Sequence, residues 1–141
     1  MSQKIIFCKG LPASGKSTWS KEYVKNNPDF LRLNKDDIRE FFGNPKFSSS
    51  FEKSVLTVQK TLGDIAIKLG KSLIIDDTNF AEKHEIYWRQ VASENSLEFE
   101  IKFFDTPVEE CIKRDSEREK SVGKHVILGM YNSYLKPKIS D

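Results

Sequence analysis

The feature that most constrains the fold is an eight-residue motif at positions 10–17, GLPASGKS, which matches the pattern G-x-x-x-x-G-K-[ST] in full. Its glycines allow backbone conformations in which successive N–H groups point inward at phosphate oxygens. An apolar segment at residues 4–8 precedes the motif, and a helix is expected to begin at Gly15 and to direct its positive end at the same site. A strand, a glycine-containing turn and a helix in this order predict a phosphate-binding loop.

Two side chains of this loop are expected to act on a bound nucleoside triphosphate. Lys16 reaches the β- and γ-phosphates as a point charge, and the Ser17 hydroxyl is a candidate ligand of Mg²⁺. We therefore predict ATP and Mg²⁺ as cofactors. The residues expected to surround the nucleotide in this part of the chain are Gly10, Pro12, Ala13, Ser14, Gly15, Lys16, Ser17 and Thr18.

The remaining sequence alternates between apolar segments typical of buried strands and patterns typical of helices. Strands are expected at residues 4–8, 30–33, 72–75 and 99–104, and helices at 15–26, 35–42, 51–69, 79–95, from 106 onward and at 127–135. This order, together with the motif at 10–17, predicts an α/β P-loop NTPase fold: a doubly wound parallel sheet of about four to five strands, with helices on both faces. An Arg-bearing lid is expected from the charged cluster at residues 113–120. Without a linker or repeat, residues 1–141 are expected to form a single P-loop kinase domain.

Local signals predict where three helices begin and which face the longest one buries. Ser48–Ser50 offer N-caps, Asn79 with Glu82 forms a pattern like a capping box, and Pro107 is expected at the first position of its helix. In the helix at 51–69, the stripe expected to face the core consists of Phe51, Val55, Val58, Leu62, Ile65 and Leu69.

Composition limits the class of protein. Hydrophobic residues make up 38% of the chain and charged residues 31%, as in a globular domain. The formal net charge of +2 is too small for a generic nucleic-acid coat, so any such contact requires a local basic groove. Cys8 and Cys111 are expected to be reduced, packed thiols. Since no segment reaches the ~20 apolar residues that span a bilayer and no secretory leader is recognisable, we expect a cytoplasmic protein, or one of the host cytoplasm if its source is viral, without a membrane partner.

A second acidic group is expected to complete the nucleotide site. The apolar segment at 72–75 ends in Asp76 and Asp77, the form of a Walker B element. Side chains alternate across a strand, so only one of the two carboxylates is expected to face the phosphates and metal. The alternative is that both simply end the strand, and the pattern does not decide which carboxylate faces the metal.

Asp36 and Asp37 follow the strand predicted at 30–33, at the carboxyl edge where open α/β sheets bind ligands. A kinase that acts on a hydroxyl group benefits from a carboxylate that accepts the proton during attack. The two residues would also suit the first turn of a helix by complementing its dipole alone. Both alternatives stay open on the pattern.

A third charged cluster, KRDSEREK at residues 113–120, is predicted to form a lid over the phosphates. Arg114 and Arg118 are four residues apart, so on one helix they share a face. Phosphoryl transfer spreads negative charge over the equatorial oxygens, which guanidinium groups stabilise. The alternative is a solvated helix in which Glu110 pairs with Arg114. The motif at 10–17 and the glycine-containing stretch after the cluster favour the lid.

The segments GLPASGKSTW, LNKDDIRE, IIDDTNF, FDTPVEECIKRDSER and GMYNSY together resemble the kinase domain of phage-type polynucleotide 5′-kinases, from residue 5 to about residue 135. The resemblance implies transfer of the ATP γ-phosphate to the 5′-hydroxyl of DNA or RNA, in nucleic-acid end healing. It also implies that Asp36 is the general base, that Arg39 contacts the acceptor phosphate, and that Arg118 stabilises the transferred group. Asp77 and Thr78, within D-T-N, would shape the acceptor and metal site.

The same resemblance implies partners. These are nucleic acid 5′-OH ends, a homo-oligomer, and a separate 3′-phosphatase or ligase, because nothing in the sequence resembles the family's phosphatase domain. Gly123 stands near a place where the family often has proline, in the region where Val122 is a candidate adenine contact.

Two other functions stay open at this point. A kinase for a small molecule such as a nucleoside would have a closed acceptor pocket, and a nucleotide-binding regulator would carry out no transfer. A polynucleotide kinase instead needs an open, basic path past Asp36 and Arg39, for which Lys35, Lys46 and Lys53 are candidates.

Overall fold

The computed structural model of the chain describes residues 2–137. Its centre, within those residues, is a parallel four-stranded sheet with the order β2-β3-β1-β4. The strands are β1 (Lys4–Gly10), β2 (Phe30–Leu33), β3 (Ser72–Ile75) and β4 (Glu98–Phe104). Parallel neighbours need crossover connections, and each crossover here contains helix. The predicted parallel sheet is confirmed.

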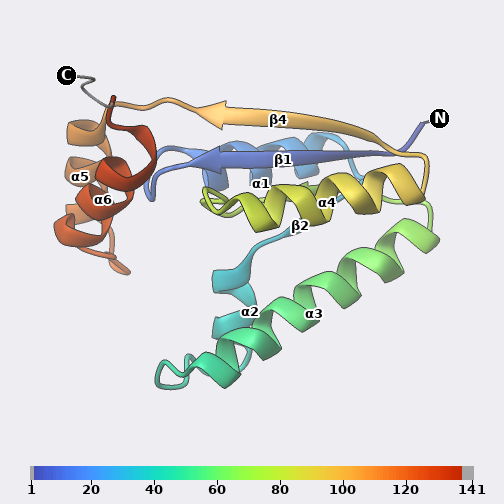
Figure 1. Cartoon of the computed structure of the whole chain (residues 1–141), viewed down its shortest axis with the longest axis horizontal. Helices are drawn as coiled ribbons and strands as arrows, with labels where there is room; N and C mark the ends of the chain where they lie inside the picture. Colours follow the sequence, from blue (N-terminus) through green and yellow to red (C-terminus); the bar gives the residue numbers. More distant parts are fainter. Residues whose placement is uncertain (1, 138–141) are drawn as a thin grey trace.

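The helices cover both faces of the sheet and its carboxyl edge. They are α1 (Lys16–Asn26), α2 (Lys35–Phe41), α3 (Ser49–Lys68), α4 (Glu82–Glu94), α5 (Val108–Ser116) and α6 (Lys124–Met130), followed by one π-helical turn, η1 (Tyr131–Leu135). In Figure 1, α1 lies behind the sheet and α4 in front of it, while α5 and α6 gather where the β1 and β4 arrows point. The predicted P-loop NTPase-like architecture, with helices on both faces, is confirmed.

Alternating side chains of the strands build two separate cores. On one face, Ile5 and Phe7 of β1 and Leu73 and Ile75 of β3 pack with Trp88 of α4 and with residues of α3. The opposite face is smaller, with Ile6, Cys8 and Ile74 packed against aromatic side chains of α1. Strand residues buried on both faces read as a continuous apolar run, which is why β1 and β3 are visible in the sequence.

A third cluster closes the carboxyl edge. Leu11, Cys111 and Ile127 form its buried centre, and side chains of α5, α6 and η1 pack around them. This cluster fixes the C-terminal helices over the end of β1. Both cysteines are free and buried, as expected, and burial raises the pKa of the Cys8 thiol to about 12.

The predicted apolar stripe of α3 is wrong in its C-terminal half. Leu62, Ile65 and Leu69 are exposed. The buried face consists instead of Val55, Gln59, Gly63, Ala66 and Ile67. The small residues Gly63 and Ala66 allow α3 to approach Trp88 closely, and this contact rotates the larger apolar side chains outward. Side-chain size at the contact, not apolar periodicity alone, decided the face.

Two of the three predicted helix starts also need correction. Ser48 caps α3 as expected, accepting a hydrogen bond from Phe51 N. Asn79 does not cap α4, which begins at Glu82, but donates to the carbonyls of Cys8 and Ile75, because buried strand ends require partners for these oxygens. Pro107 precedes the first helical residue of α5 by one position.

Within residues 2–137, no helix is both long enough and apolar enough to cross a membrane.

Gly63→Ala is expected to lower the free energy of unfolding by about 1–3 kcal/mol, as overpacking does in well-packed cores. An added Cβ would lie 2.8 Å from Cη2 of Trp88, a side chain that is 2% exposed. Urea unfolding measures the change. Gly129→Ala in α6 is the matched control, because a Cβ there has no neighbour within 4 Å. Equal stability of the two variants would contradict the close α3–α4 contact.

Candidate active site

The motif at 10–17 folds as a loop between β1 and α1. Gly15 has φ +104° and takes the N-cap position of α1 without any side-chain cap, so the first N–H groups of the helix stay free for an anion. Gly10 serves a different purpose from the one predicted, since its φ is not positive. A Cβ at Gly10 would lie 2.8 Å from Ser14 Oγ and 3.0 Å from Phe104 Cβ. Close packing, rather than backbone conformation, requires glycine there.

Three hydrogen bonds fix the shape of this loop. Ser14 N donates to Leu11 O within the loop (3.1 Å), and Gly10 N donates to Thr78 O after β3 (3.2 Å). From the other side, Thr106 Oγ1 donates to Ser14 O (2.8 Å). The segments that follow β3 and β4 therefore both hold the loop that follows β1.

Lys16 lies inside the loop rather than extended from it. Its side chain is buried, and Nζ donates to Gly10 O (2.8 Å) and Leu11 O (2.7 Å). Burial lowers the pKa of this ammonium group, although Asp76 opposes the shift. The positive charge is thus positioned at the phosphate loop before a nucleotide arrives.

Asp76 and Asp77 point in different directions, as the alternation along a strand predicts. Asp76 Oδ2 accepts from Ser20 Oγ and from Arg32 Nε, both at 2.7 Å. Asp77 accepts from Lys35 N (2.9 Å) and Gln59 Nε2 (2.8 Å). Asp76 therefore faces the phosphate side of the cavity and Asp77 the side of α2 and α3. Burial raises the pKa of the Asp77 carboxyl to about 6, against the opposing effect of Lys35.

Arg32 is a site residue that the sequence analysis missed. Besides Asp76, its guanidinium donates to Asp37 and to Ser17 Oγ (3.3 Å). It connects β2 to the loop and to the first turn of α2. One signal was available in the sequence. Arg32 is charged, yet it lies two residues from Phe30 and so shares the strand face that packs against α1.

Asp36 and Arg39 meet on α2. Asp36 Oδ1 accepts from Arg39 Nη1 at 2.6 Å, while its side chain remains 82% exposed. Asp37, its neighbour, is occupied by Arg32. The two carboxylates thus differ in position: Asp36 lines the cavity, whereas Asp37 pairs with Arg32 and does not line it.

Glu52 of α3 holds Arg39 in this orientation. Arg39 Nε donates to Oε2 of Glu52 at 3.0 Å, and a further bond joins Nη2 to Oε1. These hydrogen bonds lower the pKa of the Glu52 carboxyl. Sequence analysis missed Glu52 because its partner lies across the α2–α3 corner. One N–H on each terminal nitrogen of Arg39 remains available to an acceptor.

The lid arginines do not lie on one helix, contrary to the prediction. Arg114 lies in α5, where Glu110 accepts from Nε (3.1 Å), and α5 ends at Ser116, so that Arg118 belongs to the following loop. Both arginines nevertheless line the same cavity.

Asp115 organises the lid loop and was also missed. This buried carboxylate accepts from Ser121 Oγ (2.7 Å), Val122 N (3.0 Å), Gly123 N (2.9 Å) and Arg118 Nη2 (2.7 Å). Burial alone would raise the pKa of Asp115, but these hydrogen bonds outweigh it and hold the pKa well below its ordinary value.

These groups surround one cavity of about 760 Å³. The predicted residues that line it are Pro12, Ala13, Gly15, Lys16, Ser17, Thr18, Asp36, Arg39, Asp76, Asp77, Thr78, Arg114 and Arg118. Gly10 and Ser14 support the loop without lining the cavity. Additional lining residues include Trp19 and Asn34, and Val122, Val126 and Met130 contribute an apolar wall on the lid side. The cavity thus brings almost every predicted site residue together.

The residues fit a magnesium ion that arrives with phosphates. Asp76 Oδ1 is buried without a hydrogen-bond partner. The other carboxylate oxygen, Oδ2, and Ser17 Oγ both accept hydrogen bonds from the Arg32 guanidinium, which brings the two side chains to one place. Among the described residues, no group of three or more His, Cys, Asp or Glu side chains is arranged to hold an ion by itself. Mg²⁺ typically binds one or two protein oxygens and completes its shell with water and substrate phosphates.

A strand–loop–helix phosphate site at the carboxyl edge of a parallel sheet defines a P-loop NTPase-like domain. Within that class, the chain belongs to the P-loop kinase family described as an AAA domain, whose model matches residues 5–137. An L-seryl-tRNA(Sec) kinase of Methanococcus maripaludis is 31% identical over 137 residues, covering 94% of this chain and 53% of that protein. The chain therefore spans about half the length of this curated relative.

Solved structures resemble the chain along nearly its whole length. A chain of a Pnkp1/Rnl/Hen1 complex is 26% identical with a TM-score of 0.75, covering 99% of this chain and 44% of that one. A chain of the Pnkp1/Rnl/Hen1 RNA repair complex is 25% identical with a TM-score of 0.78, covering 93% and 43%. The APS kinase CysC of Mycobacterium tuberculosis, 18% identical with a TM-score of 0.67 over 98% and 85% of the two chains, shares the fold alone. The resemblance to polynucleotide kinase domains is confirmed.

Asp115→Ala is expected to loosen the lid loop, because four hydrogen bonds to one carboxylate are lost together. Cleavage by trypsin after Arg118 and Lys120 should accelerate by about tenfold or more, given about 1.5–3 kcal/mol for a hydrogen bond to a charged group. Limited proteolysis followed by mass spectrometry measures it. Asp105→Ala, at an exposed carboxylate just after β4, is the control. An unchanged cleavage rate would contradict the organising role of Asp115.

Proposed function

We propose that this chain is an ATP-dependent polynucleotide 5′-hydroxyl kinase domain that transfers the γ-phosphate of ATP to the 5′-OH end of DNA or RNA. One observation carries the proposal. A single cavity has the phosphate loop on one wall and the Asp36–Arg39 pair on the other, with Asp36 exposed at 82% of its side chain. This exposure supports Asp36 as the general base, because a large acceptor can approach it from solvent.

The residues have complementary roles in this reaction. The free N–H groups at the start of α1 and the Lys16 ammonium bind the triphosphate. Ser17 and Asp76 would hold Mg²⁺, which would supply positive charge to the triphosphate oxygens. Asp36 accepts the proton of the 5′-hydroxyl while the hydroxyl oxygen attacks the γ-phosphorus. The bond between the γ-phosphorus and the β–γ bridging oxygen breaks, and ADP leaves. Arg118 stabilises the charge of the transferred group.

The acceptor side has its own assignments. Arg39, fixed by Glu52, offers its remaining N–H groups to a phosphate of the acceptor strand. Asp77, with Thr78, limits the cavity between α2 and the phosphate loop. Arg114 is a further lid cation close to the loop, since a Cβ on Gly15 would lie 3.9 Å from its Nη1.

Two solved neighbours support a nucleic-acid acceptor, because both are chains of Pnkp1/Rnl/Hen1 complexes, one of them named as an RNA repair complex. By analogy, we propose that this chain works with separate end-processing proteins such as a 3′-phosphatase or ligase, and that copies of the chain associate.

A second candidate acceptor is the seryl hydroxyl of a charged tRNA. It is favoured by the 31% identity to an L-seryl-tRNA(Sec) kinase. The donor chemistry would be the same, since a primary alcohol joined to RNA attacks the γ-phosphate in both reactions. The acceptor alone distinguishes them.

Transfer assays with γ-labelled ATP and Mg²⁺ decide between these acceptors. We expect label on a 5′-hydroxyl oligonucleotide and none on the same oligonucleotide with a 5′-phosphate, which has no free alcohol at that end. Seryl-tRNA and a panel of nucleosides are offered in parallel. Label on seryl-tRNA or a nucleoside, without label on the oligonucleotide, would contradict the proposed acceptor. Label on none of them would leave a nucleotide-binding regulator.

Asp36→Asn is expected to lower the transfer rate by about 10²–10⁴, the contribution of a lost general base, while ATP binding is preserved. Lys16→Ala should abolish transfer. The matched control is Asp64→Asn, at an exposed carboxylate on α3 that pairs with Lys68 and does not line the cavity. Single-turnover kinetics and nucleotide titration separate the two steps. Full activity of Asp36→Asn would refute its assignment as the base.

A further inference from the structure

The corner between α2 and α3 exposes an unusual amount of aromatic surface. We call Phe41, Phe42, Phe47 and Phe51 the aromatic corner. Phe41 is 84% exposed, Phe47 77% and Phe42 50%. Phe42 lies edge-to-face between its neighbours, with ring centroids 5.3 Å from Phe41 and 6.2 Å from Phe51. Grouped exposed rings of this kind mark interaction surfaces more often than isolated apolar residues do.

The aromatic corner adjoins the candidate active site. A cavity of about 250 Å³ beside it is lined by Arg39, Asn44, Pro45, Phe47, Phe51 and Glu52. Arg39 also lines the main cavity. A strand whose 5′ end lies at Asp36 and whose first phosphate meets Arg39 would therefore continue directly onto the aromatic corner.

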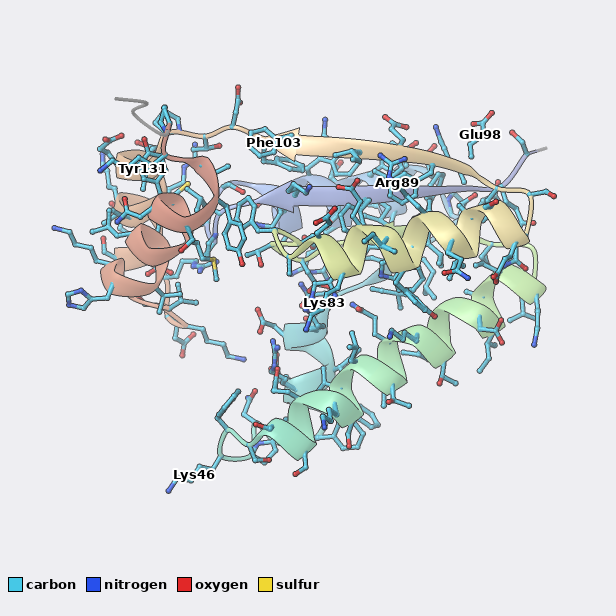
Figure 2. All side chains as sticks on the ribbon, in the orientation of Figure 1. Lys46, Lys83, Arg89, Glu98, Phe103 and Tyr131 are labelled. Carbon is cyan, nitrogen blue, oxygen red and sulfur yellow. The ribbon has the colours of Figure 1, made fainter. Side chains whose placement is uncertain are left out.

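The charges of this segment suit a phosphate backbone. Between residues 41 and 51, the sole charged residue is Lys46, and Lys53 follows shortly after in the sequence. Figure 2 shows Lys46 at the tip of the loop between α2 and α3, directed away from the protein. The two carboxylates that border the segment, Glu40 and Glu52, pair with Lys120 and Arg39. A polyanion passing this corner meets a cation and no free carboxylate between residues 41 and 51.

We propose that the aromatic corner binds the unpaired bases of the acceptor strand that follow its 5′ nucleotide, by stacking on Phe41 and Phe47. This inference rests on the proposed function and names its substrate class more closely: a single-stranded 5′-hydroxyl oligonucleotide. Every base has a π-face, and phenylalanine has no hydrogen-bonding group, so the contact is independent of sequence. Bases paired in a duplex keep their faces stacked on one another and are not available to the rings.

Direct binding tests this site without requiring catalysis. The probe is a fluorescein-labelled, single-stranded 5′-hydroxyl octanucleotide, titrated with the full chain, Mg²⁺ and a non-hydrolysable ATP analogue, and followed by anisotropy. Phe41→Ala and Phe47→Ala are each expected to raise the Kd by about 5- to 150-fold, the range for loss of one base–aromatic stack. Phe47→Trp should retain the affinity, whereas Phe47→Leu, which is apolar without a ring, should lose it.

Two controls separate stacking from other effects. Leu69→Ala removes an apolar side chain that is 74% exposed at the opposite end of α3, and it should leave the Kd unchanged. A nucleoside 3′-monophosphate, which has a 5′-hydroxyl and one phosphate but no second base, should be phosphorylated with the same KM by wild type and variants. Because Phe41 and Phe47 are exposed, circular dichroism should show an intact fold in each variant.

The outcomes distinguish this inference from the proposed function. Ring-dependent binding without transfer to the oligonucleotide would support the aromatic corner and contradict the kinase assignment. Transfer to the oligonucleotide with equal Kd in wild type and Phe variants would support the kinase and overturn the aromatic corner, leaving that surface to a protein partner. No binding of the octanucleotide by the wild type would overturn the corner, and the transfer assay would still decide the function.

Discussion

Hydrogen bonds between the ends of β1 and β3 hold the phosphate-binding loop in place. Gly10 N donates to Thr78 O (3.2 Å), and the buried side chain of Asn79 donates to Cys8 O (2.7 Å). These bonds satisfy backbone groups that the buried sheet edge would otherwise leave unpaired. The segment that supports the loop also carries Asp76 and Asp77 into the cavity. The phosphate cradle and the acidic groups opposite it are therefore parts of one rigid connection.

Arginines that line the cavity or lie beside it are held by carboxylates. Arg32 pairs with Asp76, Arg39 with Glu52, and Arg118 with Asp115. Buried ion pairs contribute little net stability, because removing both charges from water offsets most of their attraction. What such pairs supply is position. Guanidinium groups fixed before the reaction stabilise charge on a phosphoryl group without reorganising as it develops.

The sequence predicted those parts of the site that depend on neighbouring residues in the chain, but not those that depend on contacts between elements. The phosphate loop follows from a local motif, and β1 and β3 follow from short apolar runs. The buried face of α3 does not, because the contact of Gly63 with Trp88 decides it. The roles of Arg32 and Glu52 were not predicted for the same reason, because their partners lie on other elements. Asn79 matched a capping pattern, but its side chain donates a hydrogen bond to the carbonyl of Cys8 instead of capping α4.

The two walls of the cavity come from different parts of the fold, and this separates the donor from the acceptor. In the proposed reaction, the phosphate loop and lid form the donor wall and α2 forms the acceptor wall. The helices α2 and α3 extend away from the sheet (Figure 1). A relative named for seryl-tRNA(Sec) and neighbours named Pnkp1 both match nearly all of this chain. These matches therefore span both walls of the cavity. In the function proposed here, acceptor choice depends on the α2–α3 corner, where exposed rings beside Arg39 favour a flexible, unpaired strand over a compact small molecule.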